Sequence, residues 1–338
     1  MRFHDVSICS VAHVDAPCRV TSAQLEHRLA PTMKRLRLPL GLLEGLSGIR
    51  ARRMWPKGTK PSDAAALAAG RAIEAAGIDP QRIGILINSS VCRDFVEPST
   101  ACMVHGKLKL APHCLNFDVG NACLGFLSGM EIIGAMIERR QIDYGIVVDG
   151  EDSRFIVDQT IARLSAPTTD QATFWANFAT LTLGSAGVAM VLTRRELAPR
   201  GHRFLGGVTV AASEHRQLCS GHVDRMETDS ATLLTEGLQL ARRTWDEAHR
   251  ELGWTHGSLD EYVIHQVSKT HTDKFGAVFE IDPRKIFTTY PEYGNVGPAG
   301  VPLVLSKAAE AGRLEPGERI GLMGIGSGLN CAMAEVVW

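Results

Sequence analysis

The sequence lacks the features that would direct it to a membrane or out of the cell. Its first ten residues contain no apolar run of the kind that forms the core of a signal peptide. No stretch approaches the about 18 apolar residues that a membrane-spanning helix requires. From these absences we expect a cytoplasmic protein without an integral membrane segment.

A strong net charge is also missing, and so are paired cysteines. Lysines and arginines number 36 against 37 aspartates and glutamates, so the chain has no field that would attract nucleic acid, and we expect no such partner. The eight cysteines show no close CxxC pair, which favours reduced thiols over disulfides. Cys219 and His222 have the spacing of metal ligands, but no second pair accompanies them, so we predict no metal site.

What the chain does contain is a weak internal repeat. In the first half a helical pattern over 62–77 leads to an apolar strand over 83–88, and in the second half a longer helix over 229–253 leads to a strand over 262–267. The order then continues in parallel, with helices from 98 and 270, strands over 115–119 and 285–289, helices from 125 and 300, and two further pairs of strands. Such doubling predicts an α/β fold of two similar units, with helices between and outside two layers of mixed sheet.

The repeat divides the chain into an N-terminal half, 1–206, and a C-terminal half, 207–338. After Asp149 the first half carries an extra segment, about 151–183, that has no sheet pattern and is rich in apolar residues such as Phe174 and Trp175. We predict that this segment forms an apolar cap or tunnel wall rather than a solvated loop.

Cys123 is the residue most informative about chemistry. It follows a strand-like run over 114–119 and precedes a helical pattern over 125–140. At such a turn, backbone N–H groups and the positive end of the helix dipole stabilise a thiolate. We therefore expect Cys123 to be a nucleophile with a lowered pKa, as in a protease, a redox sensor or an acyl-transfer enzyme.

Two polar residues of the second half can join this cysteine. Both are predicted at strand ends, His265 in the run Val-Ile-His-Gln-Val and Asn295 in the run Tyr-Gly-Asn-Val-Gly-Pro. Alone, His265 suits a hydrogen-bonded core position and Asn295 suits a turn, but the doubling places both near the pseudo-twofold axis, facing Cys123. The loop of Gly326, Ser327 and Gly328 follows a strand and can offer backbone N–H groups to an oxyanion.

The residues alone leave two reaction classes open. In a hydrolase the asparagine would orient the histidine. In a carbon–carbon bond-forming enzyme, N–H groups of His265 and Asn295 would hold an enolate oxygen, while backbone N–H groups hold the oxygen of an acyl-enzyme.

The ordered motifs Asn-Ala-Cys123-Leu-Gly-Phe, His265-Gln, Gly-Asn295-Val-Gly-Pro-Ala and Gly-Ile-Gly326-Ser-Gly resemble the thiolase superfamily, in particular the β-ketoacyl synthase III type, over essentially the whole chain. Further segments, including 93–101 and 147–151, are most similar to the OleA-type enzymes of bacterial long-chain olefin biosynthesis. The resemblance implies a thiolase-like duplicated fold, with two mixed five-stranded sheets in a layered α-β-α-β-α arrangement, and a homodimer.

The implied reaction is a non-decarboxylative Claisen condensation of two long-chain fatty acyl-CoA molecules through an acyl-enzyme on Cys123. Its product would be a 2-alkyl-3-oxoalkanoic acid for hydrocarbon biosynthesis, passed to downstream enzymes of the olefin pathway. Glu97 is implied to be the base, reaching the site from the partner subunit. Without the resemblance, the favoured interpretation of Glu97 is a favourable charge ahead of the helix from 98. Arg50, Arg53 and Lys269 are candidates for binding the phosphates of coenzyme A, and no cofactor is implied.

Two alternatives remain. A decarboxylating β-ketoacyl-ACP synthase III, using acyl-CoA and malonyl-ACP, would need no carboxylate base at the position of Glu97. A protein that only binds or hydrolyses acyl thioesters would cleave acyl-CoA without forming a carbon–carbon bond.

Overall fold

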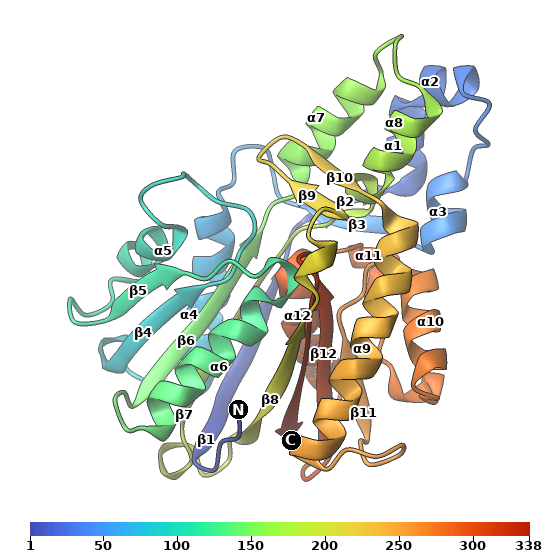
Figure 1. The fold of residues 1–338 in the computed structure, drawn as a ribbon. Coiled ribbons are helices and arrows are strands. Elements are labelled where there is room, and N and C mark those ends of the chain that lie inside the picture. The colour runs from blue at the N-terminus through green and yellow to red at the C-terminus, as the bar shows by residue number, and fades with distance from the viewer.

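The computed structural model describes all residues, 1–338, and is built on one mixed sheet of nine strands (Figure 1). The strand order is β11-β12-β13-β8-β1-β7-β6-β4-β5. The strands are β1 (Val6–Asp15), β4 (Ile83–Asn88), β5 (Leu115–Asp118), β6 (Tyr144–Glu151), β7 (Ala186–Arg194), β8 (His202–Ala211), β11 (Glu261–Ile264), β12 (Arg319–Gly326) and β13 (Asn330–Val337). Short ribbons pair β2 (Cys18–Thr21) with β3 (Ala51–Met54) and β9 (Cys219–Gly221) with β10 (Met226–Thr228).

The sheet has five strands from the first part of the chain and four from the second, joined side by side. The junction is narrow, because β1 pairs with β8 over only two residue pairs, Ser7 with Arg203 and Ile8 with His202. The prediction of two separate five-stranded sheets is therefore wrong in two respects. The second part of the chain contributes four strands, and the two parts form one continuous sheet. The predicted boundary between residues 206 and 207 falls inside β8, and the division into two halves stays a prediction.

The strand predicted over 285–289 does not form. Side chains of neighbouring residues take the hydrogen bonds that a sheet partner would provide: the Phe287 N–H donates to Glu261 Oε1 at 3.1 Å, and the Thr289 N–H donates to Gln266 Oε1 at 2.8 Å. Gln266 Nε2 in turn donates to the Phe287 carbonyl at 2.7 Å. The segment is thus held beside β11 without a backbone ladder, which repeat matching could not reveal.

The helices are α1 (Ser22–Arg28), α2 (Ala30–Arg35), α3 (Leu42–Ser47), α4 (Pro61–Ala76), α5 (Thr100–Leu108), α6 (Gly125–Glu138), α7 (Arg154–Leu164), α8 (Gln171–Asn177), α9 (Ser230–Leu252), α10 (Lys269–Val278), α11 (Tyr290–Tyr293) and α12 (Gly300–Glu310). Two of them, α6 and α12, form the central layer. Their apolar faces share one buried cluster with strands from both parts of the sheet. Gly125 and Gly300, which begin these two helices, are buried.

Helix α4 and helix α9 cover the outer faces. Alanines at helical spacing on α4 bury completely against β1, β6 and β7, and Gly187 permits this close approach, since a Cβ there would lie 2.5 Å from the Ala64 carbonyl oxygen. Helix α9 is capped by Asp229 at its start and by Gly253 at its end. Its apolar face packs against β8 and β13.

The segment predicted as a cap, residues 151–183, forms α7, α8 and a short 3₁₀ helix over Phe178–Thr182. Apolar residues of α7 and α8 share a buried cluster with α1, α2 and α3, and this group of helices lies beyond one end of the sheet (Figure 1). No helix of the structure combines the length and the apolar character needed to cross a bilayer.

Candidate active site

Cys123, His265 and the glycine loop meet at one end of β12. A Cβ on Gly326 would lie 3.5 Å from the amide nitrogen of Cys123, and a Cβ on Gly324 would lie 3.5 Å from the Cβ of His265. The 3₁₀ turn Ala122–Leu124 also packs against the turn Gly297–Ala299, which follows Asn295. The fold therefore gathers four of the predicted elements, which are separated by up to about 200 residues in the chain, around one point.

The turn that carries Cys123 is held in an unusual conformation. Ala122 has a φ of 43°, in the left-handed region that costs a residue with a Cβ about 1–2 kcal/mol. The Asn121 side chain fixes the turn on both sides, because it donates to Ser128 Oγ at 3.0 Å and accepts from Asn330 Nδ2 at 3.1 Å. These bonds tie the start of α6 to the turn between β12 and β13.

The pKa of Cys123 is higher than its position at a strand-to-helix turn predicts. Burial raises it to about 12, with further contributions from Cys219, Glu151 and Asp149. The prediction of a lowered pKa is therefore wrong for the free chain: loss of solvent and two buried carboxylates outweigh the backbone hydrogen bond to the sulfur. Cys123 is a neutral thiol at physiological pH and must lose its proton during the reaction.

His265 is buried and chemically unsatisfied. Its residue is 1% exposed, and neither ring nitrogen has a hydrogen-bond partner in the protein. Burial, helped by His271, lowers its pKa to about 3, so the ring is neutral and offers one N–H donor and one lone pair. An unpartnered buried polar group costs about 1–3 kcal/mol, and such groups are typical of functional sites.

Asn295 is oriented by its own turn. Its Oδ1 accepts the Gly297 N–H at 3.0 Å, which leaves the Nδ2 group as its free donor. Its backbone is held by the end of the cap, with the Asn295 N–H donating to the Thr182 carbonyl at 2.9 Å and the Gly184 N–H donating to the Asn295 carbonyl at 2.8 Å. Cap and asparagine therefore form one hydrogen-bonded unit.

The glycine loop supplies backbone donors rather than side chains. Residues Ser327, Gly328 and Leu329 form the turn between β12 and β13, and Gly328 has a φ of 140°, which residues with a Cβ rarely adopt. At Gly326 a Cβ would come within 3.1 Å of Leu124 Cγ. Glycine at this position thus lets the strand end approach the turn of Cys123.

Glu97 does not join this group within its own chain. It is exposed in the loop of residues 89–99, beside Val96, which is 90% exposed. The structure gives its carboxylate no hydrogen bond and no ion pair. Desolvation of Glu97 would thus have to come from outside its own chain.

The three basic residues predicted to bind the phosphates of coenzyme A make different contacts. Arg50 pairs with Glu292 at 3.0 Å and Lys269 pairs with Asp273 at 2.5 Å, and both act on the pKa of Tyr290. Arg53 instead stacks on the ring of Tyr293, 5.6 Å from its centre. Binding of phosphate by these residues stays a prediction.

A cavity of about 660 Å³ lies between the cap and the β9–β10 ribbon. Its apolar wall includes Leu46, Trp175, Phe178 and Leu218, and its volume falls within the range of about 300–1,000 Å³ that small-molecule sites occupy. Leu218 precedes Cys219, which is close enough to Cys123 to influence its pKa. The predicted apolar cap thus lines a cavity on the side of Cys123.

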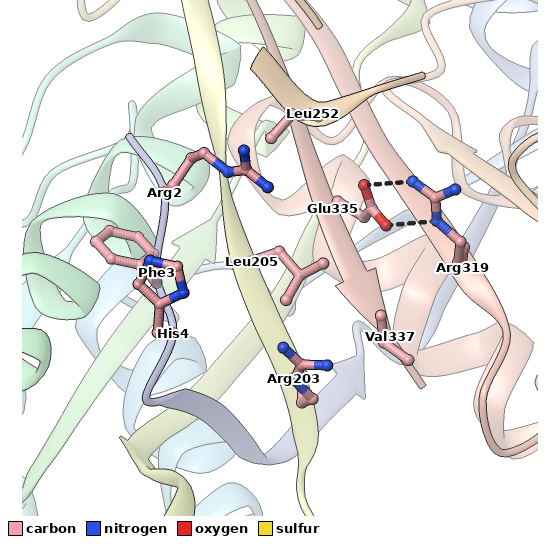
Figure 2. Close-up of a pocket in the computed structure, with 9 residues that line it drawn as sticks. All are labelled: Arg2, Phe3, His4, Arg203, Leu205, Leu252, Arg319, Glu335 and Val337. Carbon is pink, nitrogen blue, oxygen red and sulfur yellow. Dashed lines mark hydrogen bonds and ion pairs between the residues drawn. The ribbon is translucent and has the colours of Figure 1, made fainter. Parts of the chain in front are cut away.

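A second cavity, of about 270 Å³, lies at the other end of the sheet. Figure 2 shows Arg2, Arg203 and Arg319 around it, with Arg319 paired to the buried carboxylate of Glu335. From Arg319 to Gly326, beside Cys123, β12 spans roughly 23 Å at about 3.3 Å per residue. This cavity is no part of the candidate site.

Two buried carboxylates near Cys123 had no predicted role. Asp149 and Glu151 lie in β6, 0% and 5% exposed, and burial raises the pKa of each. The sequence run Val-Val-Asp149-Gly-Glu151 carried the only signal, through its family resemblance. No group of histidine, cysteine, aspartate and glutamate side chains comes together in a way that could hold a metal ion.

The sequence is similar to those of known enzymes. Residues 249–338 match the family model "3-Oxoacyl-[acyl-carrier-protein (ACP)] synthase III C terminal". The chain is 50% identical over 338 residues to an acyl-CoA:acyl-CoA alkyltransferase of Xanthomonas campestris pv. campestris, covering 100% of both chains. It is 40% identical over 350 residues to the enzyme of the same name from Shewanella oneidensis, again covering 100% of both.

Solved structures show the same likeness. A cysteine-to-serine variant of Xanthomonas campestris OleA with bound lauric acid and lauroyl-CoA superposes with a TM-score of 0.98 at 49% identity, covering 99% of this chain and 100% of that one. Other solved variants of that protein replace a glutamate or a histidine. The likeness confirms the predicted α/β, thiolase-like class.

Fold and site together define an acyltransferase of the synthase III class, with a cysteine, a histidine and an asparagine around a glycine loop. Within that class, the chain belongs to the family of the acyl-CoA:acyl-CoA alkyltransferases, as the sequence motifs predicted.

Proposed function

We propose that this enzyme joins two fatty acyl-CoA molecules head to head in a non-decarboxylative Claisen condensation. The observation that carries the carbon–carbon bond formation is the buried, unpartnered and neutral His265 beside Cys123. The non-decarboxylative course rests on Glu97 and on the 50% identity to an acyl-CoA:acyl-CoA alkyltransferase. A neutral imidazole that donates one N–H, next to the oriented amide of Asn295, suits an enolate oxygen. A histidine meant to stay protonated beside a thiolate would not be placed where its pKa is about 3.

In the first half-reaction the sulfur of Cys123 attacks the thioester carbonyl of one acyl-CoA. The carbonyl oxygen becomes negative and accepts hydrogen bonds from the Cys123 N–H and from the loop of Gly326, Ser327 and Gly328. The C–S bond to coenzyme A then breaks. The proton of the Cys123 thiol leaves with free coenzyme A, and the acyl group remains on the enzyme as a thioester.

In the second half-reaction Glu97 of the partner subunit removes an α-proton from another acyl-CoA. Asn295 Nδ2 and the His265 N–H hold the resulting enolate oxygen, and the α-carbon attacks the carbonyl of the acyl-enzyme. The bond between that carbonyl and the sulfur of Cys123 breaks, and the thiolate takes up the proton held by Glu97. Water then releases coenzyme A, leaving a 2-alkyl-3-oxoalkanoic acid as the product for olefin biosynthesis.

A homodimer is part of the proposal. Strand β5 is the outermost strand of the sheet, and its Leu115 and Phe117 are 54% and 39% exposed. Val91, Phe95 and Val96 of the 89–99 loop are also exposed. An unpaired strand edge beside exposed apolar side chains is typical of a surface that another chain covers, and covering it would bury the loop that carries Glu97.

The cavity beside the cap supports an acyl chain as the bound group, because Trp175, Phe178 and Leu218 give it an apolar wall. Lauroyl-CoA bound to the related Xanthomonas protein supports the same substrate class. We place the reaction in the cytoplasm, where eight free thiols remain reduced.

The proposal is tested by incubating the purified enzyme with one saturated acyl-CoA and analysing the products by mass spectrometry. We expect a condensed β-keto acid, or the ketone that it forms on loss of carbon dioxide. Condensation that appears only after a malonyl thioester is added would favour the decarboxylating synthase instead. Free fatty acid as the sole product would favour a hydrolase.

A further inference from the structure

The loop of residues 89–99 connects β4 to α5 and carries Glu97. Three carboxylates hold its backbone or its ends. Asp94 of the loop accepts from the Ser62 N–H at 2.9 Å, and Asp118 accepts from the N–H groups of Thr100 and Ala101 at the start of α5. The third carboxylate, Glu151, holds the beginning of the loop.

Glu151 binds the loop with both of its oxygens. The Val91 N–H donates to Oε1 at 2.6 Å and the Cys92 N–H donates to Oε2 at 3.3 Å. The residue lies at the end of β6, every residue of which is buried. The strand thus gives the loop a rigid anchor a few residues before Glu97.

The same carboxylate also touches the opposite side of the site. A Cβ on Gly297 would lie 3.7 Å from Glu151 Cδ, and Gly297 is the residue whose N–H orients Asn295. Glu151 therefore lies between the turn of Asn295 and the start of the loop that carries Glu97.

Glu151 has no cationic partner, although it is 5% exposed and only two residues from the buried Asp149. Burying a carboxylate without a cation costs free energy, which a hydrophobic residue at the end of β6 would avoid. Each of its two oxygens accepts one of two adjacent backbone N–H groups, whereas an amide of the same size would offer one oxygen and one NH₂ group. These hydrogen bonds to the loop offset part of the cost of burying the acid.

We propose that Glu151 is a positioning residue for the condensation step: it holds the start of the 89–99 loop so that Glu97 reaches the site of the partner subunit in the correct place. This inference rests on the proposed function. Glu151 does not touch the reacting atoms. It acts on the second half-reaction through Glu97, and it influences the acylation of Cys123 only through its charge, which helps to raise the pKa of that thiol.

The test uses Glu151→Gln in the full-length enzyme. The amide keeps the size of the side chain but puts an NH₂ group against one of the two N–H donors. Acylation of Cys123 is followed as coenzyme A released in a single turnover and as the mass of the acyl-enzyme. Condensation is followed as β-keto acid, and the competing loss of acyl-enzyme is followed as free fatty acid.

We expect acylation to be no slower than in the wild type, because the amide removes one of the charges that raise the pKa of Cys123. Condensation should fall by about tenfold or more and free fatty acid should rise, because small displacements of a catalytic group reduce rates strongly. Glu335→Gln is the matched control. It alters another buried carboxylate, which binds Trp254 and Arg319 at the other end of the sheet, and it should change neither step.

Equal losses in both half-reactions, unchanged condensation, or the same split in Glu335→Gln would overturn the role of Glu151. Glu151→Asp keeps both oxygens but withdraws them by one methylene. If Glu151→Gln does not fold, Glu151→Asp should show the same retained acylation and reduced condensation. A wild-type enzyme that acylates Cys123 but forms no condensed product from acyl-CoA alone would refute the proposed function itself, whatever the variants do.

Discussion

The imidazole of His265 lies directly against Gly300, the first residue of α12: a Cβ at that position would come 2.8 Å from Nδ1. No real Cβ contact is that short, so any side chain at 300 must displace the ring. The start of the central helix therefore sets the plane of the histidine, and this contact leads to the first prediction.

Gly300→Ala should reduce product formation by about tenfold or more, because the displaced ring no longer points its N–H at the enolate oxygen. Steady-state kinetics with an acyl-CoA substrate measure the loss. Gly70→Ala is the control, since a Cβ at this exposed position of α4 meets no atom within 4 Å. Full activity of Gly300→Ala would mean that His265 is free to move and is not held by the helix.

Alkylation of Cys123 should reveal a raised pKa in the free enzyme. With a pKa of about 12, the thiolate fraction, and with it the rate of reaction with iodoacetamide, should increase about tenfold per pH unit from pH 7 to beyond pH 10. Mass spectrometry of the peptide that contains Cys123 measures the rate, and the exposed Cys102 serves as a reference. A plateau below pH 8 would restore the lowered pKa expected from the sequence.

Acid should weaken the fold through His265. Its pKa is lowered in the folded state to about 3 from an ordinary value of 6.5, so the unfolded chain binds the proton first. The stability contributed by the neutral ring is complete above about pH 6.5 and is lost as the pH falls towards 3. Between pH 6.5 and 4.5 the wild type should lose about 2 kcal/mol more unfolding free energy than His265→Asn, measured by urea denaturation.

Asn295→Asp should separate the two half-reactions. The aspartate keeps an oxygen that can accept the Gly297 N–H but loses the Nδ2 donor, and its charge repels an enolate. Loss of one such donor reduces rates by about 10²–10³, so condensation should fall by this factor. Acylation of Cys123, which uses the glycine loop, should proceed nearly as before. Equal loss in both steps would assign Asn295 to the acylation step as well.

Leu115→Asp should produce monomers that acylate but do not condense. The substitution places a charge on the exposed edge strand β5, where a second subunit is proposed to pack. Analytical ultracentrifugation measures the association state, and single-turnover release of coenzyme A measures acylation. Val223→Asp, at an 81% exposed position between β9 and β10, is the control. A monomer that condenses at the wild-type rate would refute action of Glu97 across the interface.

Much of the fold could be predicted, because apolar periodicity and capping residues report directly on local structure. The limits of α4, β4, β5 and α9 agree with the predicted ones to within one residue. The segment over 285–289 could not be predicted, since its hydrogen bonds go to the side chains of Glu261 and Gln266. Joining of the two parts of the sheet depends on two residue pairs that no pattern marks.

The positions of the site residues could be predicted from the order of strands and helices, but the effect of burial and of neighbouring charges on them could not. Strand ends and helix starts converge, so His265 and the glycine loop were found beside Cys123. The pKa of Cys123 depends on burial and on Asp149, Glu151 and Cys219, whose distances a sequence does not contain. Glu97 is exposed in a single chain, so its role depends on a second subunit.

The hydrogen bond between the Asn295 N–H and the Thr182 carbonyl ties the cap to the chemistry. Phe178, which lines the cavity, begins the same short 3₁₀ helix that Thr182 ends. We therefore expect a substitution that reshapes this wall to shift residue 295 as well, whose amide is the proposed donor to the enolate oxygen. Variants altered at Phe178 should change in condensation rate together with chain-length preference.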